Sequence, residues 1–328
     1  MRVRTYKLQL LVVMITTMLI SGCGNNKEYY EFSSDNSSVA DVASVVSGSN
    51  LYKSEPFCKE ICVIPKSEVG QNLSDNFIAG GILNVDITDN KVLCSKNIYD
   101  KMYPASLTKL GTALMCLKYG DMADDVVVSK TAANLNVPGA KLCFLQEGDV
   151  VNFEVLLTSF LVYSGNDAGV ALAEHISGSE AEFCKKMNEE LKMLGAVNTN
   201  FINCHGLPDK KHYTSVYDIY LMLNELSKYD KFTEITSLDS YTARFKDKTG
   251  RDVTKVYEST DKYLTGEKTL PKGVKILAGK TGTTNDAGYC LAVLSEKKKT
   301  SHKYISVVMK AYSSDSLYAQ MTELLKMK

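Results

Sequence analysis

Apolar patterns typical of β-strands occur near both ends of this chain, and patterns typical of helices lie between them. The first two predicted strands, Phe77–Asp86 and Lys91–Cys94, are joined as a hairpin. Three more apolar runs, separated by turn or charged segments, follow near the C-terminus: Val274–Ala278, Ala287–Leu294 and Tyr304–Ala311. This order predicts an α/β (α+β) fold, in which one antiparallel sheet is built from both ends of the chain and carries an inserted helical subdomain.

The segment between the two groups of strands has helical periodicity with start and stop signals. Ser179 and Ser215, each followed three residues later by an acidic residue, predict capping boxes for two helices. Further helices are predicted from the spacing of apolar residues: from Leu107 up to a stop at Gly120, Val150–Val162, Asp167–Ile176 and Ser314–Leu325. We therefore expect an all-helical subdomain over roughly residues 110–230.

The N-terminus is typical of an export signal. Three basic residues precede an apolar run from Leu8 to Ile20, which suits a secretory signal and is too short for a comfortable membrane span. The ending Ile20-Ser21-Gly22-Cys23 resembles the lipobox of bacterial lipoproteins, in which the chain is cut before the cysteine and the thiol carries a diacylglyceryl group. The alternatives are a plain signal peptide cut elsewhere and an uncleaved anchor. Each of the three places the rest of the chain outside the cytoplasm.

These observations predict three parts of the chain. Residues 1–22 are a lipoprotein-type signal peptide, 23–65 a flexible tether rich in Ser, Asn, Asp and Gly near its start, and 66–328 the folded domain. Lipidation at Cys23 would hold that domain at the outer face of the bacterial cytoplasmic membrane.

Composition argues against several classes of function. Lys+Arg and Asp+Glu are equal at 38 each, so no net field favours nucleic acid or an anionic membrane surface. The four histidines and nine cysteines match no zinc pattern and no His-Glu-x-x-His motif, and we expect neither a metal nor another cofactor. A local Cys58–Cys62 bridge is possible in an exported chain, but most other cysteines lie in apolar stretches typical of buried thiols.

A serine and a lysine stand three residues apart where a helix is predicted to begin, in Tyr103-Pro104-Ala105-Ser106-Leu107-Thr108-Lys109. Residues three apart share a helix face, so Lys109 can reach the Ser106 hydroxyl. A serine attacks at neutral pH only if a nearby base takes its proton, and lysine is such a base only where its surroundings keep it neutral. Alone, the pattern also fits an ordinary surface helix.

Two further motifs strengthen the catalytic interpretation. Ser164-Gly165-Asn166 lies at a predicted helix break, and Lys280-Thr281-Gly282 lies beside a predicted strand. Ser-x-x-Lys, Ser-Asp-Asn and Lys-Thr-Gly are the signature of penicillin-binding proteins and class A β-lactamases, and the three motifs here stand in that order with Gly165 in place of the aspartate. Each triplet alone is a weak signal, whereas all three in order in an exported chain are a strong one.

The wider sequence resembles the serine D-alanyl-D-alanine carboxypeptidases, the low-molecular-mass penicillin-binding proteins of the peptidase S11 type. The resemblance covers roughly residues 66–328 and rests on four segments: 104–109, 164–168, Gly206-Leu207-Pro208-Asp209, and 280–289. It implies a penicillin-binding-protein transpeptidase-like fold, with the active site in a cleft between the sheet and the helical subdomain. It also implies a substrate, the peptidoglycan stem peptide ending in D-Ala-D-Ala, and β-lactams as covalent inhibitors.

The resemblance also implies a role for each motif residue. Ser106 would form an acyl-enzyme, Lys109 would take its proton, and Ser164 would relay a proton to the leaving amine. Repulsion from Lys280 would help to keep Lys109 neutral. The substrate-binding residues would be Asn166, Lys280, Thr281, Gly282 and Thr283, with Gly282 allowing close approach of substrate to the backbone. The backbone N–H groups of Ser106 and Thr283 would form the oxyanion hole.

Two features depart from the family pattern. Many relatives carry a further β-rich domain and a C-terminal amphipathic anchor, which this sequence does not show, and a lipid on Cys23 would replace that anchor. Some relatives bring an arginine to the substrate carboxylate, whereas the corresponding segment 259–264 has none and Arg251 is too far upstream to assign.

Two rival functions differ in chemistry. A β-lactamase would add a carboxylate that activates water, but the second motif has Gly165 in place of aspartate, and no Glu-x-x-Leu-Asn element follows it. A non-catalytic β-lactam- or peptidoglycan-binding homologue would be free to lose one of the four residues Ser106, Lys109, Ser164 and Lys280, and all four are present.

Overall fold

The computed structural model describes residues 61–70, 77–135 and 137–327. They belong to a compact unit spanning Cys58–Lys328, which contains every described helix and strand and both hydrophobic clusters. Residues 58–328 therefore form a folding unit of their own. The predicted signal peptide, Cys23, Cys58 and most of the predicted tether lie outside the described residues. Cys62 and Ile64, at the end of the predicted tether, are buried in the core of this unit.

The central element is a five-stranded antiparallel sheet in the order β2-β1-β9-β8-β7. Its strands come from both ends of the chain, as the sequence predicts: β1 Gly81–Asp86, β2 Lys91–Lys96, β7 Val274–Thr284, β8 Gly288–Lys297 and β9 Lys303–Ala311. The predicted α/β fold class is confirmed. The first strand starts four residues later than predicted, because Phe77–Gly80 is not paired as a strand.

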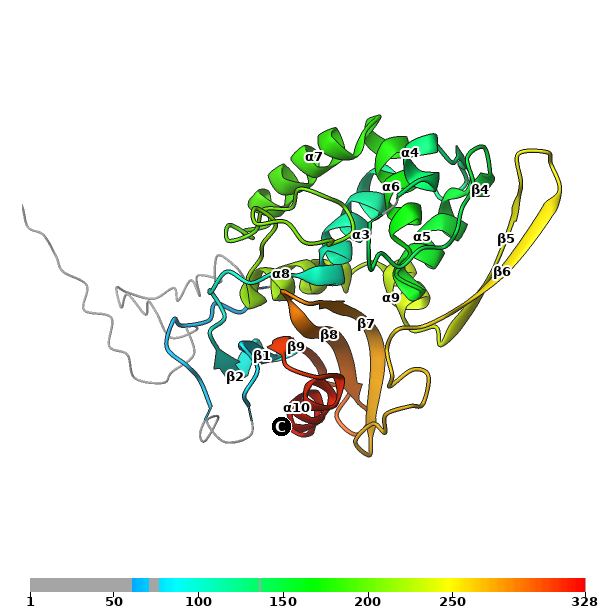
Figure 1. The fold of residues 1–328 in the computed structure, drawn as a ribbon. Helices are drawn as coiled ribbons and strands as arrows, with labels where there is room; N and C mark the ends of the chain where they lie inside the picture. Colours follow the sequence, from blue (N-terminus) through cyan, green and yellow to red (C-terminus); the bar gives the residue numbers. More distant parts are fainter. Residues whose placement is uncertain (1–60, 71–76, 136, 328) are drawn as a thin grey trace, which may run out of the picture. The chain divides into compact units, whose positions relative to one another are not determined.

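Helices cover both faces of this sheet (Figure 1). Helix α10, Ser314–Lys326, packs on one face, where Ile82 of β1 meets Leu317 and Met321. Helix α8, Val216–Leu226, packs on the other, the side to which Leu83 and Val85 belong. Since side chains alternate along a strand, the fully buried sequence of β1 requires cover on both sides.

The region inserted between β2 and β7 is mainly helical. Helix α3 lies at its centre and contacts α5, α6, α7 and α8. The helices of the insertion are α3 Thr108–Tyr119, α4 Lys130–Ala133, α5 Phe153–Val162, α6 Asn166–Ser177, α7 Glu180–Met193, α8, and α9 Asp230–Thr236. The side chains of Ser179 and Ser215 accept the backbone N–H groups of Glu182 and Asp218, as expected of helix caps.

The insertion also contains a four-stranded sheet, two of whose strands lie within residues 110–230, so the prediction that this subdomain is all-helical is wrong. Its order is β3-β4-β5-β6, with β3 Asp125–Val127, β4 Val150–Asn152, β5 Ser240–Lys246 and β6 Asp252–Glu258. The prediction of one helix over Val150–Val162 is therefore wrong at its start. β-branched Val150 and Val151 pair with β3, and the Asn152 side chain caps α5 by accepting the Glu154 N–H.

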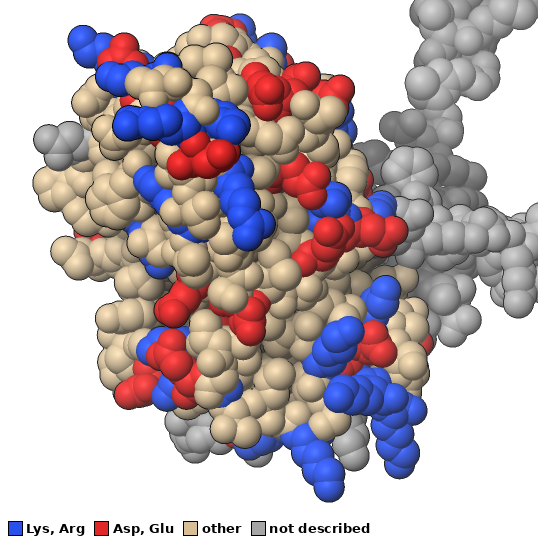
Figure 2. All heavy atoms as spheres, turned by 90° about the vertical axis from the view of Figure 1, so that its right-hand side faces the viewer, with Lys and Arg blue, Asp and Glu red and all other residues tan. Residues whose placement is uncertain are grey.

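Three further observations concern cysteines, membrane spans and surface charge. The seven cysteines within the described residues are buried and unpaired. No helix in the described ranges has the length and apolar character required to cross a bilayer. Acidic and basic side chains are mixed over most of the face in Figure 2, whereas lysine or arginine side chains gather at its lower end.

Candidate active site

Ser106 lies in a tight turn between the sheet and the helical insertion. It is the middle residue of a 3₁₀ turn, η2 Ala105–Leu107, which leads directly into α3. Ala105 has a φ of 49°, a left-handed conformation that non-glycine residues rarely adopt. The Thr108 hydroxyl stabilises the turn by donating to the Ala105 carbonyl over 2.8 Å. Such strained backbone is typical of functional sites.

Two glycines allow other segments to pack directly against this turn. A Cβ atom on Gly206 would lie 1.8 Å from the Ala105 carbonyl oxygen, and one on Gly282 would lie 2.9 Å from the Ser106 nitrogen. Gly282 is predicted to provide room for substrate, and it lines the cleft. Its missing side chain also provides room for the Ser106 turn beside β7.

We expect Gly206→Ala to destabilise the fold far more than Gly178→Ala. Both glycines have positive φ, 95° and 78°, so both substitutions carry a backbone cost of about 1 kcal/mol. Only Gly206 faces a backbone atom at clashing distance, since nothing lies within 4 Å of a Cβ on Gly178. Urea unfolding should therefore show at least about 2 kcal/mol more loss for Gly206→Ala. Equal losses would contradict the close packing of this loop on Ala105.

The Lys109 amine lies at the centre of the site. Its Nζ donates to Asn166 Oδ1 over 2.6 Å and to the His205 carbonyl oxygen over 2.7 Å, and lies 3.2 Å from Ser106 Oγ. The side chain is fully buried, with the Phe160 ring 5.2 Å from Nζ. Burial, with a contribution from the Lys141 charge, lowers the pKa of Lys109 to about 7.

This geometry makes neutral Lys109 a base directed at Ser106. A neutral amine has two N–H bonds and one lone pair. The two carbonyl oxygens of Asn166 and His205 take both N–H bonds, which leaves the lone pair for the Ser106 hydroxyl. With a pKa near neutrality, Lys109 is both available to accept a proton and able to return one.

The second motif occupies the turn that precedes α6. Ser164 has a φ of 71° and lines the cleft, and its side chain makes no hydrogen bond within the described part of the chain. Gly165 packs so closely against Cys143 that a Cβ atom would lie 2.1 Å from its sulfur. The Asp167 carboxylate accepts the N–H groups of Cys143 and Leu145, which fixes this segment on the helix start.

The third motif lies on β7, with Lys280 beneath the cleft surface. Its buried Nζ donates to the Thr281 carbonyl over 3.0 Å. Burial is the largest cause that lowers the pKa of Lys280 well below its ordinary value, followed by the charges of Lys109 and Lys141, while the buried Asp261 opposes the shift. The Lys109 charge therefore acts on Lys280, whereas burial and the Lys141 charge, rather than Lys280, lower the pKa of Lys109. No hydrogen bond joins Lys280 to Ser164 or Ser106 among the described residues.

A cleft of about 550 Å³ lies over these residues. Its lining brings together most of the predicted site, namely Ser106, Ser164, Asn166, Thr281, Gly282 and Thr283. The lining also includes two cations that the motifs do not identify, Lys141 and Lys262. Thr260, from the segment that lacks the family arginine, accepts a 2.5 Å hydrogen bond from the Thr281 hydroxyl.

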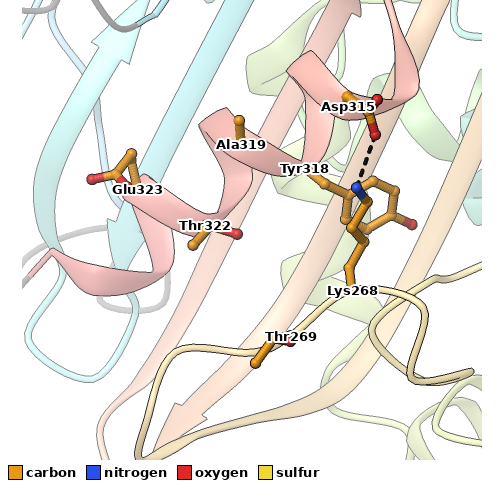
Figure 3. Close-up of a pocket in the computed structure, with 7 residues that line it drawn as sticks. All are labelled: Lys268, Thr269, Asp315, Tyr318, Ala319, Thr322 and Glu323. Carbon is orange, nitrogen blue, oxygen red and sulfur yellow. Dashed lines mark hydrogen bonds and ion pairs between the residues drawn. The ribbon is translucent and has the colours of Figure 1, made fainter.

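A second hollow, also about 550 Å³, lies along the outer side of α10 (Figure 3). Lys268 and Asp315 form an ion pair of 2.8 Å across it. Tyr318 lines both this hollow and the cleft, and its hydroxyl lies 3.4 Å from the Asp261 carboxylate. No motif residue lines this second hollow, so the chemistry belongs to the cleft.

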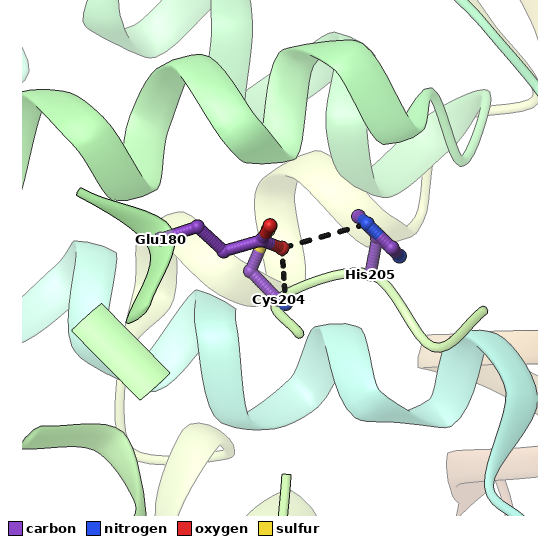
Figure 4. A group of neighbouring side chains, drawn as sticks. All are labelled: Glu180, Cys204 and His205. Atoms are coloured by element: carbon purple, nitrogen blue, oxygen red, sulfur yellow. Dashed lines mark hydrogen bonds and ion pairs between the residues drawn. The ribbon is translucent and has the colours of Figure 1, made fainter. Parts of the chain in front are cut away.

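Glu180 supports the loop that supplies the His205 carbonyl (Figure 4). Glu180, at the start of α7, accepts the Cys204 N–H over 2.9 Å, and its carboxylate lies 3.4 Å from His205 Nε2. Burial and the Lys109 charge lower the pKa of His205 well below its ordinary value, which disfavours a charged ring in this contact. Glu180, Cys204 and His205 offer ligand atoms within 4.8 Å of one another. Because Glu180 accepts the Cys204 N–H, the group supports the backbone of this loop.

His212 supports the same region from the other side. Its Nδ1 accepts the Ile202 N–H over 3.1 Å, so Nε2 carries the proton and donates to Thr108 Oγ1 over 2.7 Å. Burial lowers the pKa of His212 to about 4. The sequence predicts His205 and His212 to be structural or solvent-facing; both are buried and structural. Their part in the site depends on backbone contacts that no motif records.

Comparison with known proteins identifies relatives of the same kind. A family model described as D-alanyl-D-alanine carboxypeptidase matches residues 69–313. The chain is 38% identical over 243 residues to D-alanyl-D-alanine carboxypeptidase DacF of Bacillus subtilis, covering 72% of this chain and 58% of that protein. It is 32% identical over 231 residues to DacA of Haemophilus influenzae, covering 69% and 55%. The chain thus spans little more than half the length of these relatives.

Solved structures share the fold. A mutant of the Streptomyces K15 DD-transpeptidase superimposes with a TM-score of 0.70 at 24% identity, covering 75% of this chain and 96% of that one. Penicillin binding protein 5 from Haemophilus influenzae superimposes with a TM-score of 0.67 at 28% identity, covering 80% and 72%. The predicted penicillin-binding-protein fold is therefore confirmed.

Proposed function

This chain belongs to the D-alanyl-D-alanine carboxypeptidase family, and we propose that it removes the terminal D-alanine from peptidoglycan stem peptides through an acyl-enzyme on Ser106. One observation carries the proposal. The buried Lys109 amine, with a pKa of about 7, directs both of its N–H bonds to carbonyl oxygens and its lone pair to Ser106 Oγ at 3.2 Å.

The first half of the reaction forms the acyl-enzyme. Lys109 accepts the Ser106 proton as Oγ attacks the carbonyl carbon of the penultimate D-alanine. The backbone N–H groups of Ser106 and Thr283, which both line the cleft, stabilise the developing oxyanion. The C–N bond then breaks, and the leaving amine takes a proton from Lys109, relayed by the Ser164 hydroxyl. The Ser164 hydroxyl lies in the cleft without a hydrogen-bond partner among the described residues, which supports this role.

The second half releases the shortened peptide. Water attacks the acyl-enzyme, gives its proton to Lys109, and restores the Ser106 hydroxyl as the ester bond breaks. A β-lactam would follow the same first half, because opening its ring also places an acyl group on Ser106. Its leaving amine stays attached to the acyl group, which favours a longer-lived adduct and supports the proposal that β-lactams act as covalent inhibitors.

We assign substrate recognition to β7 and to the segment 259–264, whose Thr260 contacts Thr281 of β7. Thr281 and Thr283 offer hydroxyl groups for the terminal carboxylate, with Lys280 buried beside them. Lys262 also lines the cleft and lies in the segment that lacks the family arginine. We propose that its ammonium group supplies part of the charge for that carboxylate. Asn166 holds Lys109 and faces the substrate amide.

The rate of D-alanine release is expected to rise with pH through about 7. Because neutral Lys109 is the base, its active fraction grows about tenfold per pH unit well below its pKa and levels off above it. The profile of kcat/KM for a pentapeptide ending in D-Ala-D-Ala tests this. A rate that falls as pH rises from 6 to 8, the window around the Lys109 pKa, would rule out Lys109 as the base.

The same peptide tests the proposed function itself. Residues 58–328 should release one D-alanine per pentapeptide and leave the tetrapeptide, because only the last peptide bond places a free carboxylate near Thr281 and Thr283. The stereoisomer ending in L-alanine serves as the control and should not be cleaved. Equal cleavage of both peptides, or of neither, would contradict a D-Ala-D-Ala carboxypeptidase.

We also propose that the chain is exported and anchored by a lipid. The basic, apolar and Ser-Gly-Cys segments of residues 1–23 support cleavage before Cys23 and lipidation of its thiol. That places the domain at the outer face of the cytoplasmic membrane, where peptidoglycan precursors occur. Metabolic labelling with a fatty acid should mark the full chain and should not mark a Cys23→Ala variant.

A further inference from the structure

Lysines from four separate segments gather at one end of the central sheet, although the whole chain has equal numbers of basic and acidic residues. They lie in or beside the β1–β2 turn, the segment before β7, the β8–β9 turn and the start of β9. We name this group the basic end. It comprises Lys91, Lys272, Lys275, Lys298, Lys299 and Lys303, all of them exposed.

Backbone hydrogen bonds hold these turns side by side. Lys298 N donates to the Gly273 carbonyl over 2.9 Å, which joins the β8–β9 turn to the segment before β7. Ile87 N donates to the Lys303 carbonyl over 3.0 Å, which joins the β1–β2 turn to β9. The sheet end at which β7 begins is also the lower end in Figure 1, and Figure 2 shows blue side chains gathered at that level.

The charge of the basic end is not neutralised locally. None of its six lysines forms an ion pair with a carboxylate in the described ranges. Asp86 and Asp89 face His302, at 2.8 and 3.7 Å, and Glu296 lies between Lys275 and Lys303 in the strand register. Three carboxylates, Asp86, Asp89 and Glu296, therefore stand against six lysines, and two of the three face His302.

A hollow of about 610 Å³ opens in the middle of the basic end. Leu93, Val274 and Leu325 provide apolar lining, while Lys91, Lys272 and Lys299 stand among the lining residues. Apolar surface within a ring of ammonium groups suits a partner that combines negative charge with hydrocarbon.

The described chain also enters the domain at this end. The Cys62 thiol donates to the Asn90 carbonyl, with 3.2 Å between sulfur and oxygen, and Asn90 belongs to the β1–β2 turn between Asp89 and Lys91. The first described residues therefore lie beside the basic end.

We propose that the basic end docks on the anionic headgroups of a phospholipid bilayer and orients the catalytic cleft away from it. Eight residues of β7 separate Val274, at the basic end, from Gly282 in the cleft, a span of about 26 Å at strand spacing. Helix α10 spans the same two places in the opposite direction, from Leu317 in the cleft lining to Leu325 at the hollow. Docking would hold the cleft at about this distance above the lipid headgroups, where stem peptides outside the membrane can reach it.

Vesicle co-sedimentation of residues 58–328 tests the docking without any contribution from a lipid on Cys23. We expect binding to vesicles that contain phosphatidylglycerol, weak binding to pure phosphatidylcholine, and loss of binding at high salt. Each lysine near an anionic surface strengthens binding about fivefold. The double variant Lys298→Ala/Lys299→Ala should therefore weaken it by roughly 25-fold.

The matched control is Lys185→Ala/Lys186→Ala, which removes two adjacent exposed lysines from α7. It should bind vesicles like the unchanged protein, and both double variants should keep the unchanged rate of D-alanine release. Equal losses in the two variants would show non-specific attraction and overturn the proposal. So would binding to soluble polyphosphate without binding to vesicles, which would assign the surface to an anionic polymer.

Discussion

Replacing Ser106 with alanine is expected to abolish both the release of D-alanine and the covalent capture of penicillin. Ser106 Oγ is the protein nucleophile in the proposed reaction, and in serine hydrolases removal of that nucleophile costs roughly 10⁶-fold in kcat. The Ser106 side chain makes no hydrogen bond other than its contact with Lys109 Nζ in the described structure, so its loss should leave the fold intact. Intact mass spectrometry after mixing with benzylpenicillin, together with a D-alanine assay, measures both effects.

Ser164→Ala is the matched control for this experiment. It removes the other motif serine that lines the cleft but leaves the proposed nucleophile in place. We expect it to slow turnover by about 10²–10⁴-fold, the usual contribution of proton transfer, while a penicillin adduct still forms. Normal D-alanine release by the Ser106→Ala protein, or an adduct on another residue, would contradict the mechanism.

Replacing Lys109 with methionine is expected to lower the rate of acylation by about 10²–10⁴-fold without unfolding the protein. Methionine has a similar length, and its apolar end removes the cost of burying an amine beside the Phe160 ring. Two carbonyl acceptors, Asn166 Oδ1 and the His205 oxygen, lose their donor, so a modest loss of stability offsets that gain. Stopped-flow acylation and a urea titration separate the two effects.

Lys141→Met separates the base from a neighbouring charge. Lys141 lies in the same cleft, with its Nζ 4.0 Å from the centre of the Tyr163 ring, and makes no hydrogen bond to Ser106. Loss of its charge should raise the pKa of Lys109 slightly, since that charge is one cause of the lowered value. We expect less than about a tenfold change in acylation at pH 8. A loss as large as that of Lys109→Met would mean that charge in the cleft, rather than a base at Lys109, controls the reaction.

Local sequence signals predict much of the fold. Polar caps and glycine stops set the ends of α6, α7 and α8, and apolar runs mark the strands of the central sheet. The β5–β6 hairpin escapes prediction because its strands are mostly exposed and lack a long apolar run. Val150–Asn152 reads as helix because its apolar residues continue into α5, and only pairing with β3 distinguishes it.

Short motifs likewise predict some residues of the candidate site and miss others. Ser106, Lys109, Ser164, Asn166 and the Lys280 motif carry their chemistry in their side chains, and short motifs therefore identify them. The His205 carbonyl, by contrast, acts through a backbone atom that any residue could supply. Glu180 and Gly206 act through contacts with segments far away in the sequence. The pKa of Lys109 depends above all on burial, which exists only in the folded chain.

The most direct test of the central claim is the intact mass of residues 58–328 followed over time after addition of benzylpenicillin. We predict one long-lived adduct per chain, located on Ser106 by peptide mapping, because the family chemistry ends in an acyl-enzyme whose attached amine cannot leave. Consumption of the drug without a lasting adduct would instead indicate a β-lactamase. Neither adduct nor consumption would contradict acyl transfer at Ser106 and leave only a binding role for the cleft.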